Sequence, residues 1–167
     1  MKKIAIVIDS LTGGGAERVM ISLANALIEQ GHQVTLLSLS EYCDYSIPPT
    51  IDLHKLFTGK ASKVDRVWRI KKSIHILEQW FVDIQSKKGN FDLILSNLDR
   101  SNNLLAECEL KDDKRLFFII HTSIEEEIIR QKKLGWFAYR YLVKTKARLS
   151  GKQLITVSEG LKKEVNE

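Results

Sequence analysis

The feature that most constrains this chain is a run of three glycines, Gly13 to Gly15, placed where an apolar strand gives way to a helix. Residues 4–8 are all apolar, which suits one buried strand, and from Val19 onward apolar residues recur with helical spacings of three and four. Glycines let a ligand approach the backbone closely, and the start of a helix offers free N–H groups and a positive dipole end. The run therefore predicts either an anion site, for a phosphate or a similar group, or a tight connection without a ligand.

Strand and helix patterns alternate along the whole chain. Strands are expected at residues 3–9, 34–39, 51–56, 91–96, 115–120 and 154–157, and helices at residues 15–30, 62–86, 102–109, 124–133, 136–149 and after Ser158. This alternation predicts the α/β class, with a Rossmann-like, mostly parallel sheet and helices on both faces. A chain of 167 residues fits one domain of ordinary size.

Polar residues follow several of the predicted strands at the point where each strand ends. These clusters are the glycine turn, residues 97–100, residues 121–123, and Ser158 with Glu159. Ligands of open parallel sheets bind at the carboxyl ends of the strands. Because the polar clusters share this edge of the sheet, a ligand at the glycine turn is favoured over a connection that binds no ligand.

Several familiar sites are excluded by spacing. A dinucleotide fingerprint needs glycine at position 18, where Arg18 stands, and neither a P-loop Lys-Ser/Thr pair nor a Gly-x-Ser-x-Gly elbow is present. The four histidines and the two cysteines do not share metal-ligand spacings, so we expect no bound metal and two reduced thiols.

The net charge of +5 is unevenly distributed. Residues 128–158 contain eight Lys and Arg and neither Asp nor Glu, which predicts an anionic partner such as a membrane surface or a phosphorylated substrate. No nucleic-acid-binding module is recognisable, so we expect no nucleic-acid partner. The first apolar run is too short for an export signal. We therefore expect a cytoplasmic protein, with docking to the inner face of the cell membrane left open.

Four segments, in this order, resemble retaining glycosyltransferases of family 4. They are DSLTGGGAER (9–18) with GHQVTLL (31–37), FDLILSN (91–97), IIHT (119–122) and ITVSEGLK (155–162). The resemblance covers nearly the whole chain and implies one half of a GT-B fold, in which two Rossmann-like domains face each other across a cleft. It implies that residues 1–167 are a single N-terminal, acceptor-binding domain and that the C-terminal donor-binding domain is absent from this chain.

The resemblance also implies a function. The full-length protein would be a glycosyltransferase of the hexosyltransferase type, moving a sugar from a nucleotide-sugar donor to a saccharide or lipid-linked acceptor in bacterial surface polysaccharide or lipopolysaccharide biosynthesis. We expect this half alone to be inactive, and no cofactor or metal besides the donor substrate. The alternative is a non-catalytic Rossmann-like module that binds an anionic ligand or partner.

On matching positions, the resemblance makes His121 the catalytic residue, contacting the donor sugar or orienting the acceptor. A histidine that only bonds the backbone at the edge of the core is the alternative. Substrate or donor-phosphate contacts are expected from Gly13, Gly14, Gly15, Asp9, Glu17, Asn97 and Ser158. Asp9 would either line the acceptor pocket or bond the N–H groups of its own loop, and Glu17 would either bind substrate or cap its helix.

Two basic and aromatic segments suit the surface of an anionic membrane, or docking of the acceptor. Their residues are Lys63, Arg66, Trp68, Arg69, Arg140 and Lys144. The alternatives are a solvated face for the first segment and, for the second, a surface covered by the other domain.

Overall fold

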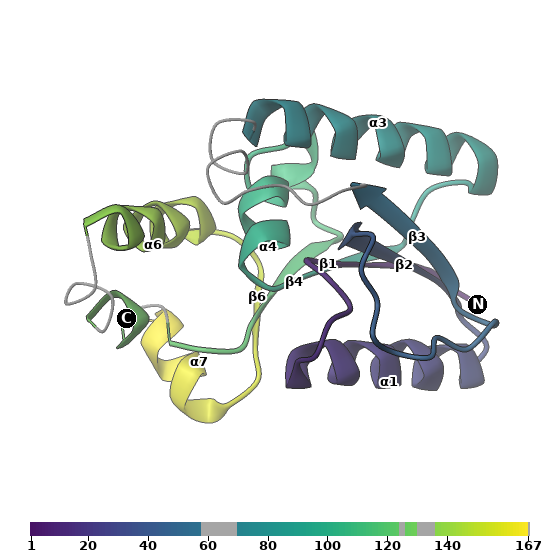
Figure 1. Ribbon diagram of the computed structural model, residues 1–167, viewed down its shortest axis with the longest axis horizontal. Helices are drawn as coiled ribbons and strands as arrows, with labels where there is room; N and C mark the ends of the chain where they lie inside the picture. The colour runs from purple at the N-terminus through teal and green to yellow at the C-terminus, as the bar shows by residue number, and fades with distance from the viewer. Residues whose placement is uncertain (58–69, 124–125, 130–135, 167) are drawn as a thin grey trace.

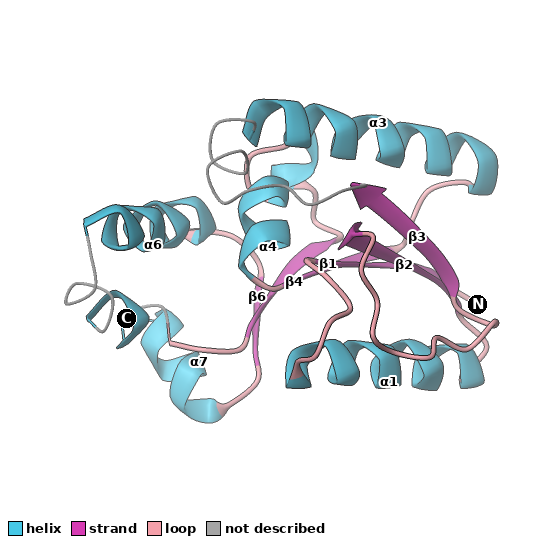
Figure 2. Ribbon diagram, in the orientation of Figure 1, coloured by secondary structure: helices cyan, strands magenta, loops and turns pink. Residues whose placement is uncertain are grey.

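The computed structural model describes residues 1–57, 70–123, 126–129 and 136–166. Its elements, shown in Figures 1 and 2, are β1 (Lys3–Ile8), α1 (Gly15–Glu29), β2 (Gln33–Ser40), β3 (Asp52–Phe57), α3 (Ile70–Lys88), β4 (Leu93–Asn97), α4 (Asp99–Leu105), η1 (Glu109–Asp112), β5 (Leu116–Ile120), α6 (Trp136–Leu149), β6 (Leu154–Thr156) and α7 (Glu159–Asn166). Residues 126–129 are also helical.

The six strands form one sheet in the order β3-β2-β1-β4-β5-β6, and every neighbouring pair is parallel. β1 lies inside the sheet, where Ile4 pairs with Val34 on one side and with Leu93 on the other. Because all strands run the same way, their carboxyl ends meet at one edge. The predicted α/β, Rossmann-like sheet is confirmed.

The sheet separates two hydrophobic cores, and successive side chains of β1 point alternately into one core and the other. Ile4, Ile6 and Ile8 pack in the core that α1 covers, whereas Ala5 and Val7 face the core beneath α3 and α4. Figure 1 shows α1 on one side of the sheet and α3 and α4 on the other. This explains the continuous apolar run of β1, since a strand buried on both faces has no polar side.

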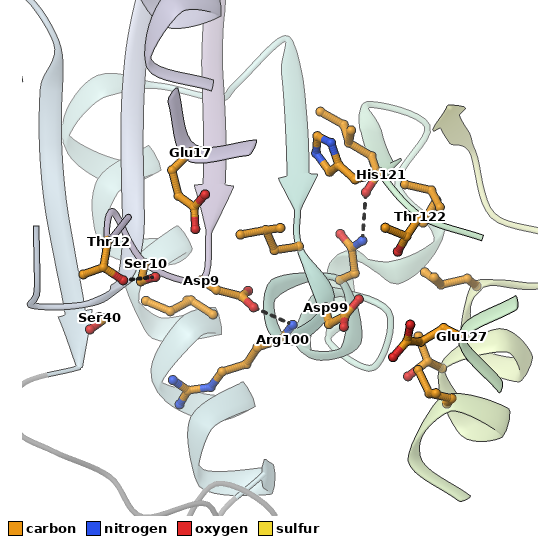
Figure 3. Close-up of a pocket in the computed structure, with 18 of the residues that line it drawn as sticks. Asp9, Ser10, Thr12, Glu17, Ser40, Asp99, Arg100, His121, Thr122 and Glu127 are labelled. Carbon is orange, nitrogen blue, oxygen red and sulfur yellow. Dashed lines mark hydrogen bonds between the residues drawn. The ribbon is translucent and has the colours of Figure 1, made fainter. Parts of the chain in front are cut away.

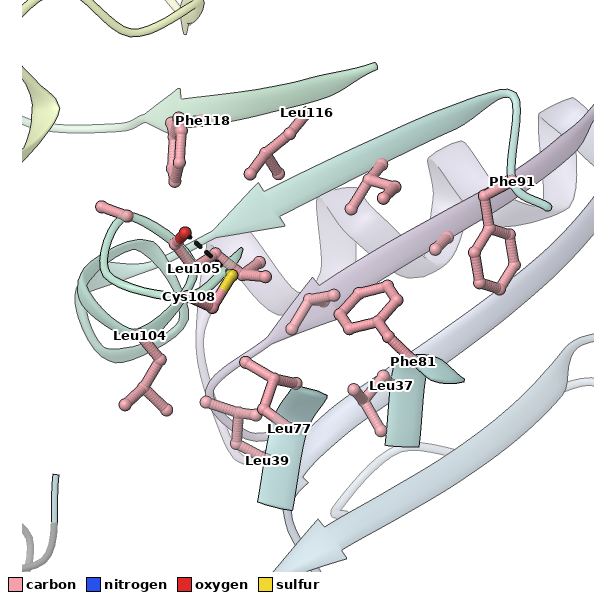
Figure 4. Packing of buried hydrophobic residues seen from close by; sticks show 14 of the residues in the cluster. Leu37, Leu39, Leu77, Phe81, Phe91, Leu104, Leu105, Cys108, Leu116 and Phe118 are labelled. Carbon is pink, nitrogen blue, oxygen red and sulfur yellow. Dashed lines mark hydrogen bonds between the residues drawn. The ribbon is translucent and has the colours of Figure 1, made fainter. Parts of the chain in front are cut away.

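The larger core fills the space between the sheet and α3. Figure 4 shows Leu77 and Phe81 of α3 packed toward Leu37 and Leu39 of β2. Cys108 is buried in the same cluster, and burial raises the pKa of its thiol to about 11. Cys43 and Cys108 are both free thiols, in agreement with the two reduced thiols expected from the sequence.

Most predicted elements are present, with one informative shift. The helix expected from residue 102 begins at Asp99 instead, because the carboxylate of Asp9, the residue after β1, accepts hydrogen bonds from its first turn. The first part of the helix expected at residues 62–86 lies outside the described residues, and α3 is seen from Ile70. Within the described ranges, no helix combines the length and apolar character needed to cross a membrane.

Candidate active-site pocket

A pocket of about 730 Å³ opens at the carboxyl edge of the sheet. Figure 3 shows side chains entering it from the ends of β1, β4 and β5 and from neighbouring helices. Its polar lining includes Asp9, Ser10, Thr12, Glu17, Ser40, Tyr42, Asp99, Arg100, Asn102, His121, Thr122, Glu127 and Thr145. The position agrees with the edge at which open parallel sheets bind ligands.

Asp9, the residue after β1, holds the start of α4. Its carboxylate accepts hydrogen bonds from the backbone N–H groups of Arg100 at 3.0 Å and Ser101 at 2.6 Å, and from the Ser101 hydroxyl at 2.8 Å. Burial nevertheless raises the pKa of Asp9, against the lowering effect of these bonds. Asp9 thus lines the pocket, but the N–H groups that it binds belong to α4 and not to its own loop.

The residue between β4 and α4 adopts an unusual backbone conformation. Leu98 has φ of 75° and ψ of 165°, a region that side chains other than glycine rarely enter. Such strain costs on the order of 1–3 kcal/mol and persists only where surrounding contacts enforce it. Here the Asp9 bonds to the next turn fix the backbone, and Leu98 itself lines the pocket.

His121 follows β5 and is bonded to the last residue of β4. Its Nε2 donates a hydrogen bond to the side-chain oxygen of Asn97, which leaves Nδ1 as the unprotonated nitrogen of the neutral ring. Burial lowers the pKa of His121, and the charge of Glu17 partly opposes that shift. The ring therefore favours the neutral form, which can accept a proton or a hydrogen bond at neutral pH.

Asn97 is completely buried, and its amide nitrogen has no hydrogen-bond partner within the described part of the chain. The polar side chains of Ser96 in β4 and Asn102 in α4 do have partners: Ser96 donates to Asn102, and Asn102 donates to the carbonyl of Ile119 in β5. These bonds tie β4, α4 and β5 together, and His121 is attached to the end of β4 through its bond to the Asn97 side chain.

The glycine turn is shaped by Glu17 and by the loop after β2. A Cβ added to Gly14 would lie 1.9 Å from Glu17 Oε2, so a larger residue at this position would displace the folded-back side chain of Glu17. Glu17 is 7% exposed and lines the pocket, and its Oε2 has no hydrogen-bond partner among the described residues. From the other side, the Tyr45 hydroxyl donates to the Gly14 carbonyl at 2.7 Å.

Asp99 is a third acidic residue of the pocket lining, after Asp9 and Glu17. Burial raises the pKa of Asp99, and the nearby charge of Glu127 raises it further. Arg100 is the only Lys or Arg among the pocket-lining residues within the described ranges, and its guanidinium lies 4.8 Å from the centre of the Phe57 ring. The pocket is therefore predominantly acidic in a chain whose net charge is positive.

Only some of the site residues predicted from the sequence line the pocket. Asp9, Glu17 and His121 line the pocket, and Asn97 contacts it through His121. Ser158 is exposed and accepts a hydrogen bond from the Leu161 N–H at the start of α7. The three glycines shape the turn without lining the pocket.

The residues predicted for membrane or acceptor docking divide into two groups. Arg140 and Lys144 are exposed on α6, and the Arg140 guanidinium lies 4.6 Å from the centre of the Trp136 ring. The other four lie outside the described residues: Lys63, Arg66, Trp68 and Arg69.

The sequence placed Asp99 and Arg100 in the polar cluster of residues 97–100 but gave neither residue a role of its own, and both line the pocket. Glu127, which also lines the pocket, was not singled out. Glu127 gave no signal, because only the fold brings residues 126–129 beside α4. No group of three or more His, Cys, Asp and Glu in the described ranges is arranged to hold a metal ion.

Comparison with known proteins assigns the chain to a family. The sequence model named Glycosyltransferase Family 4 matches residues 13–167, nearly the whole chain. The chain belongs to Glycosyltransferase Family 4. No curated protein sequence matches it.

Several solved structures that share this fold at low sequence identity are glycosyltransferases. Sucrose-phosphate synthase from Thermosynechococcus elongatus has a TM-score of 0.70 at 16% identity, covering 99% of this chain and 45% of that one. The apo form of UGT2 from Phytolacca americana has a TM-score of 0.63 at 11% identity, covering 93% and 45%. A UDP-glucosyltransferase from Polygonum tinctorium, in complex with 3,4-dichloroaniline, has a TM-score of 0.63 at 13% identity, covering 94% and 46%. The family 4 chain thus spans less than half the length of these structures, and its fold is one Rossmann-like half of a GT-B enzyme.

Proposed function

We propose that this chain is the acceptor-binding half of a retaining glycosyltransferase. The complete enzyme would move a hexose from a nucleotide-sugar to a saccharide or lipid-linked acceptor in bacterial surface polysaccharide assembly. The observation that carries the proposal is the pocket at the carboxyl edge of a family 4 domain, lined by a histidine that is bonded to Asn97 and whose lowered pKa favours the neutral ring. A pocket of this size suits a saccharide group.

His121 is the proposed catalytic residue. Its bond to Asn97 fixes the ring orientation, and burial keeps the ring neutral, so that Nδ1 can accept a hydrogen bond from substrate. The leaving group of a nucleotide-sugar is a diphosphate, which needs electrostatic stabilisation more than a nucleophile. Because the pocket lining is mainly acidic, we assign that stabilisation to a C-terminal donor-binding domain.

The test is sugar transfer by the product of the complete gene, read through its natural stop codon. With a panel of nucleotide-sugars and bacterial glycolipid extracts, we expect transfer or slow donor hydrolysis. His121→Ala should reduce transfer by at least about a hundredfold with folding intact. His75→Ala, which removes an exposed histidine from α3, is the control and should leave transfer unchanged.

Full activity of the His121 variant would refute the assignment of the catalytic residue. Absence of transfer and of donor hydrolysis with every nucleotide-sugar would instead favour a non-catalytic module. The same gene product would also show whether a donor-binding domain follows residue 167.

We also propose that α6 places the protein at the inner face of the cell membrane. Trp136, Arg140, Val143 and Lys144 are exposed on this helix, with Trp136 59% and Val143 41% exposed. Exposed apolar groups beside cations suit the headgroup region of an anionic bilayer. Phosphatidylglycerol vesicles should bind the protein and shift its tryptophan emission, and Arg140→Glu with Lys144→Glu should abolish that binding. Equal binding by the double variant would refute this surface.

A further inference from the structure

Helix α6 is attached to α4 by hydrogen bonds that meet at Asn103. Asn103 lies in α4 and is 2% exposed, and its Nδ2 lies 2.9 Å from the Thr145 hydroxyl and 3.1 Å from the Tyr141 hydroxyl. The two N–H groups of this amide are shared with the Asp99 carbonyl at 2.8 Å. Its Oδ1 accepts a hydrogen bond from Arg148 at 2.8 Å. We call Asn103, Tyr141, Thr145 and Arg148 the Asn103 cluster.

The buried side of α6 is polar at its centre. Among the side chains of this helix that the structure describes, Leu142 and Leu149 are buried, and Thr145, at 2% exposed, lies between them. A buried hydroxyl is costly without a partner, and Thr145 bonds both Asn103 and the Tyr141 carbonyl. Hydrogen bonds require a definite geometry, so the Asn103 cluster fixes how α6 lies against α4.

A second contact strengthens the same attachment. The Arg148 guanidinium also bonds the carboxylate of Glu107, which lies just beyond the end of α4. The Tyr141 hydroxyl lies inside the protein, where burial and the charges of Asp99 and Asp9 raise its pKa to about 12. The phenol therefore stays neutral and keeps its bond to Asn103 across the physiological pH range.

The outward side of α6 is the surface proposed to meet the membrane. Its residues Trp136, Arg140, Val143 and Lys144 follow one another with helical spacings. The three residues of the Asn103 cluster that belong to α6 have the same spacings of four and three, shifted around the helix. Figure 1 shows α6 beside α4. One helix thus presents a docking side to solvent and a hydrogen-bonding side to α4.

We propose that the Asn103 cluster couples membrane docking of α6 to the stability of α4. Local opening of α4 breaks the bonds of Asn103 and releases α6 on that side. A bilayer that holds α6 in its place therefore makes the opening rarer, because less conformational freedom is gained. This inference rests on the proposed membrane surface of α6 and not on the reaction that the enzyme catalyses.

The test is amide hydrogen exchange of residues 99–105, followed by mass spectrometry with and without phosphatidylglycerol vesicles. At a lipid concentration about ten times the dissociation constant, openings that release α6 become about tenfold rarer. We therefore expect exchange in α4 to slow by up to about tenfold and exchange in α1 to stay unchanged. Phosphatidylcholine vesicles, which carry no net charge, should change neither helix.

The decisive variant is Asn103→Leu, which removes the shared amide and changes no residue on the outward side of α6. Thr145 and Arg148 keep their bonds to the Tyr141 carbonyl and to Glu107. The variant should bind the vesicles, as measured by sedimentation, but its α4 should no longer respond to them. Gln79→Leu removes an exposed amide from α3 and is the matched control, which should respond as wild type.

A second pair of variants keeps the test decisive if Asn103→Leu does not fold. Thr145→Val keeps the shape of the side chain and removes its hydroxyl, so it should weaken the response of α4. Thr145→Ser keeps the hydroxyl and should preserve the response.

The possible failures are distinguishable. Unchanged exchange in α4 of the wild-type chain on bound vesicles, or an equal response in Asn103→Leu, overturns the coupling and leaves the membrane surface standing. Absence of vesicle binding by the wild-type chain overturns both the coupling and the membrane surface. Neither result affects the proposed sugar transfer, which is measured with the complete gene product.

Discussion

Replacing Gly14 with alanine should destabilise the protein through Glu17. The backbone of Gly14 is extended, with φ of −121° and ψ of 159°, so alanine meets no backbone strain. Its Cβ would nevertheless lie 1.9 Å from Glu17 Oε2 and 2.7 Å from Glu17 Cδ, which forces the carboxyl group away from the start of α1. Losing that dipole interaction costs about 1 kcal/mol, and alanine is a poorer N-cap than glycine by about 1 kcal/mol.

A double-mutant cycle separates the two contributions. We expect Gly14→Ala to lower the free energy of unfolding in urea by about 2 kcal/mol in the wild-type background, but by only about 1 kcal/mol in Glu17→Ala. Gly15→Ala is the control: a Cβ there meets nothing within 4 Å, and the change should stabilise the protein by about 0.5 kcal/mol. An equal cost of Gly14→Ala in both backgrounds would refute the proposed contact between glycine and carboxylate.

Three further predictions concern single groups. Burial lowers the pKa of His121 from 6.5, so this residue binds its proton more tightly in the unfolded chain than in the folded one. The free energy of unfolding should therefore rise with pH up to about 6.5, and His121→Gln should flatten that rise. An unchanged slope in the variant would contradict the assignment. In Cys43→Ser, the remaining Cys108 thiol, 2% exposed and with a pKa of about 11, should react with a disulfide reagent only at the rate of global unfolding, and rapid labelling of the folded protein would contradict its burial. Asp9→Ala should lower the free energy of unfolding by about 2 kcal/mol and should speed hydrogen exchange in α4, because the N–H groups of the first turn lose their acceptor. A variant as stable as wild type would show that water takes the place of the carboxylate as acceptor.

The sheet was predictable because its signals are local. Five apolar residues in β1 and the glycine at the end of α1 fix a strand and a helix without help from distant residues. The start of α4 was not predictable in this way. Its capping carboxylate comes from Asp9, about ninety residues earlier in the chain, and no local pattern reveals such a bond.

Some features of the site were likewise predictable from the sequence, and others were not. Parallel strands bring the ends of β1 and β5 to one edge of the sheet, so Asp9 and His121 were predictable as residues of the same edge, and both line the pocket. The role of the glycines was not, because the folded-back position of Glu17 depends on three-dimensional packing. The acidity of the pocket was hidden as well, since a net charge of +5 describes the whole surface and not one cavity.

The bonds between the glycine turn and the loop after β2 bear on how this domain can be altered. The Leu11 N–H donates to the Tyr42 carbonyl, the Asp44 N–H donates to the Leu11 carbonyl at 2.8 Å, and the Tyr45 hydroxyl reaches the Gly14 carbonyl. The two loops therefore form one structural unit, although they lie apart in the sequence. The first two bonds need matching backbone paths in both loops and the third needs the Tyr45 side chain, so a chimera that imports only the glycine turn of another family member separates parts that fit each other. Recombination between members of the family should succeed when residues 9–18 and 41–47 are exchanged together.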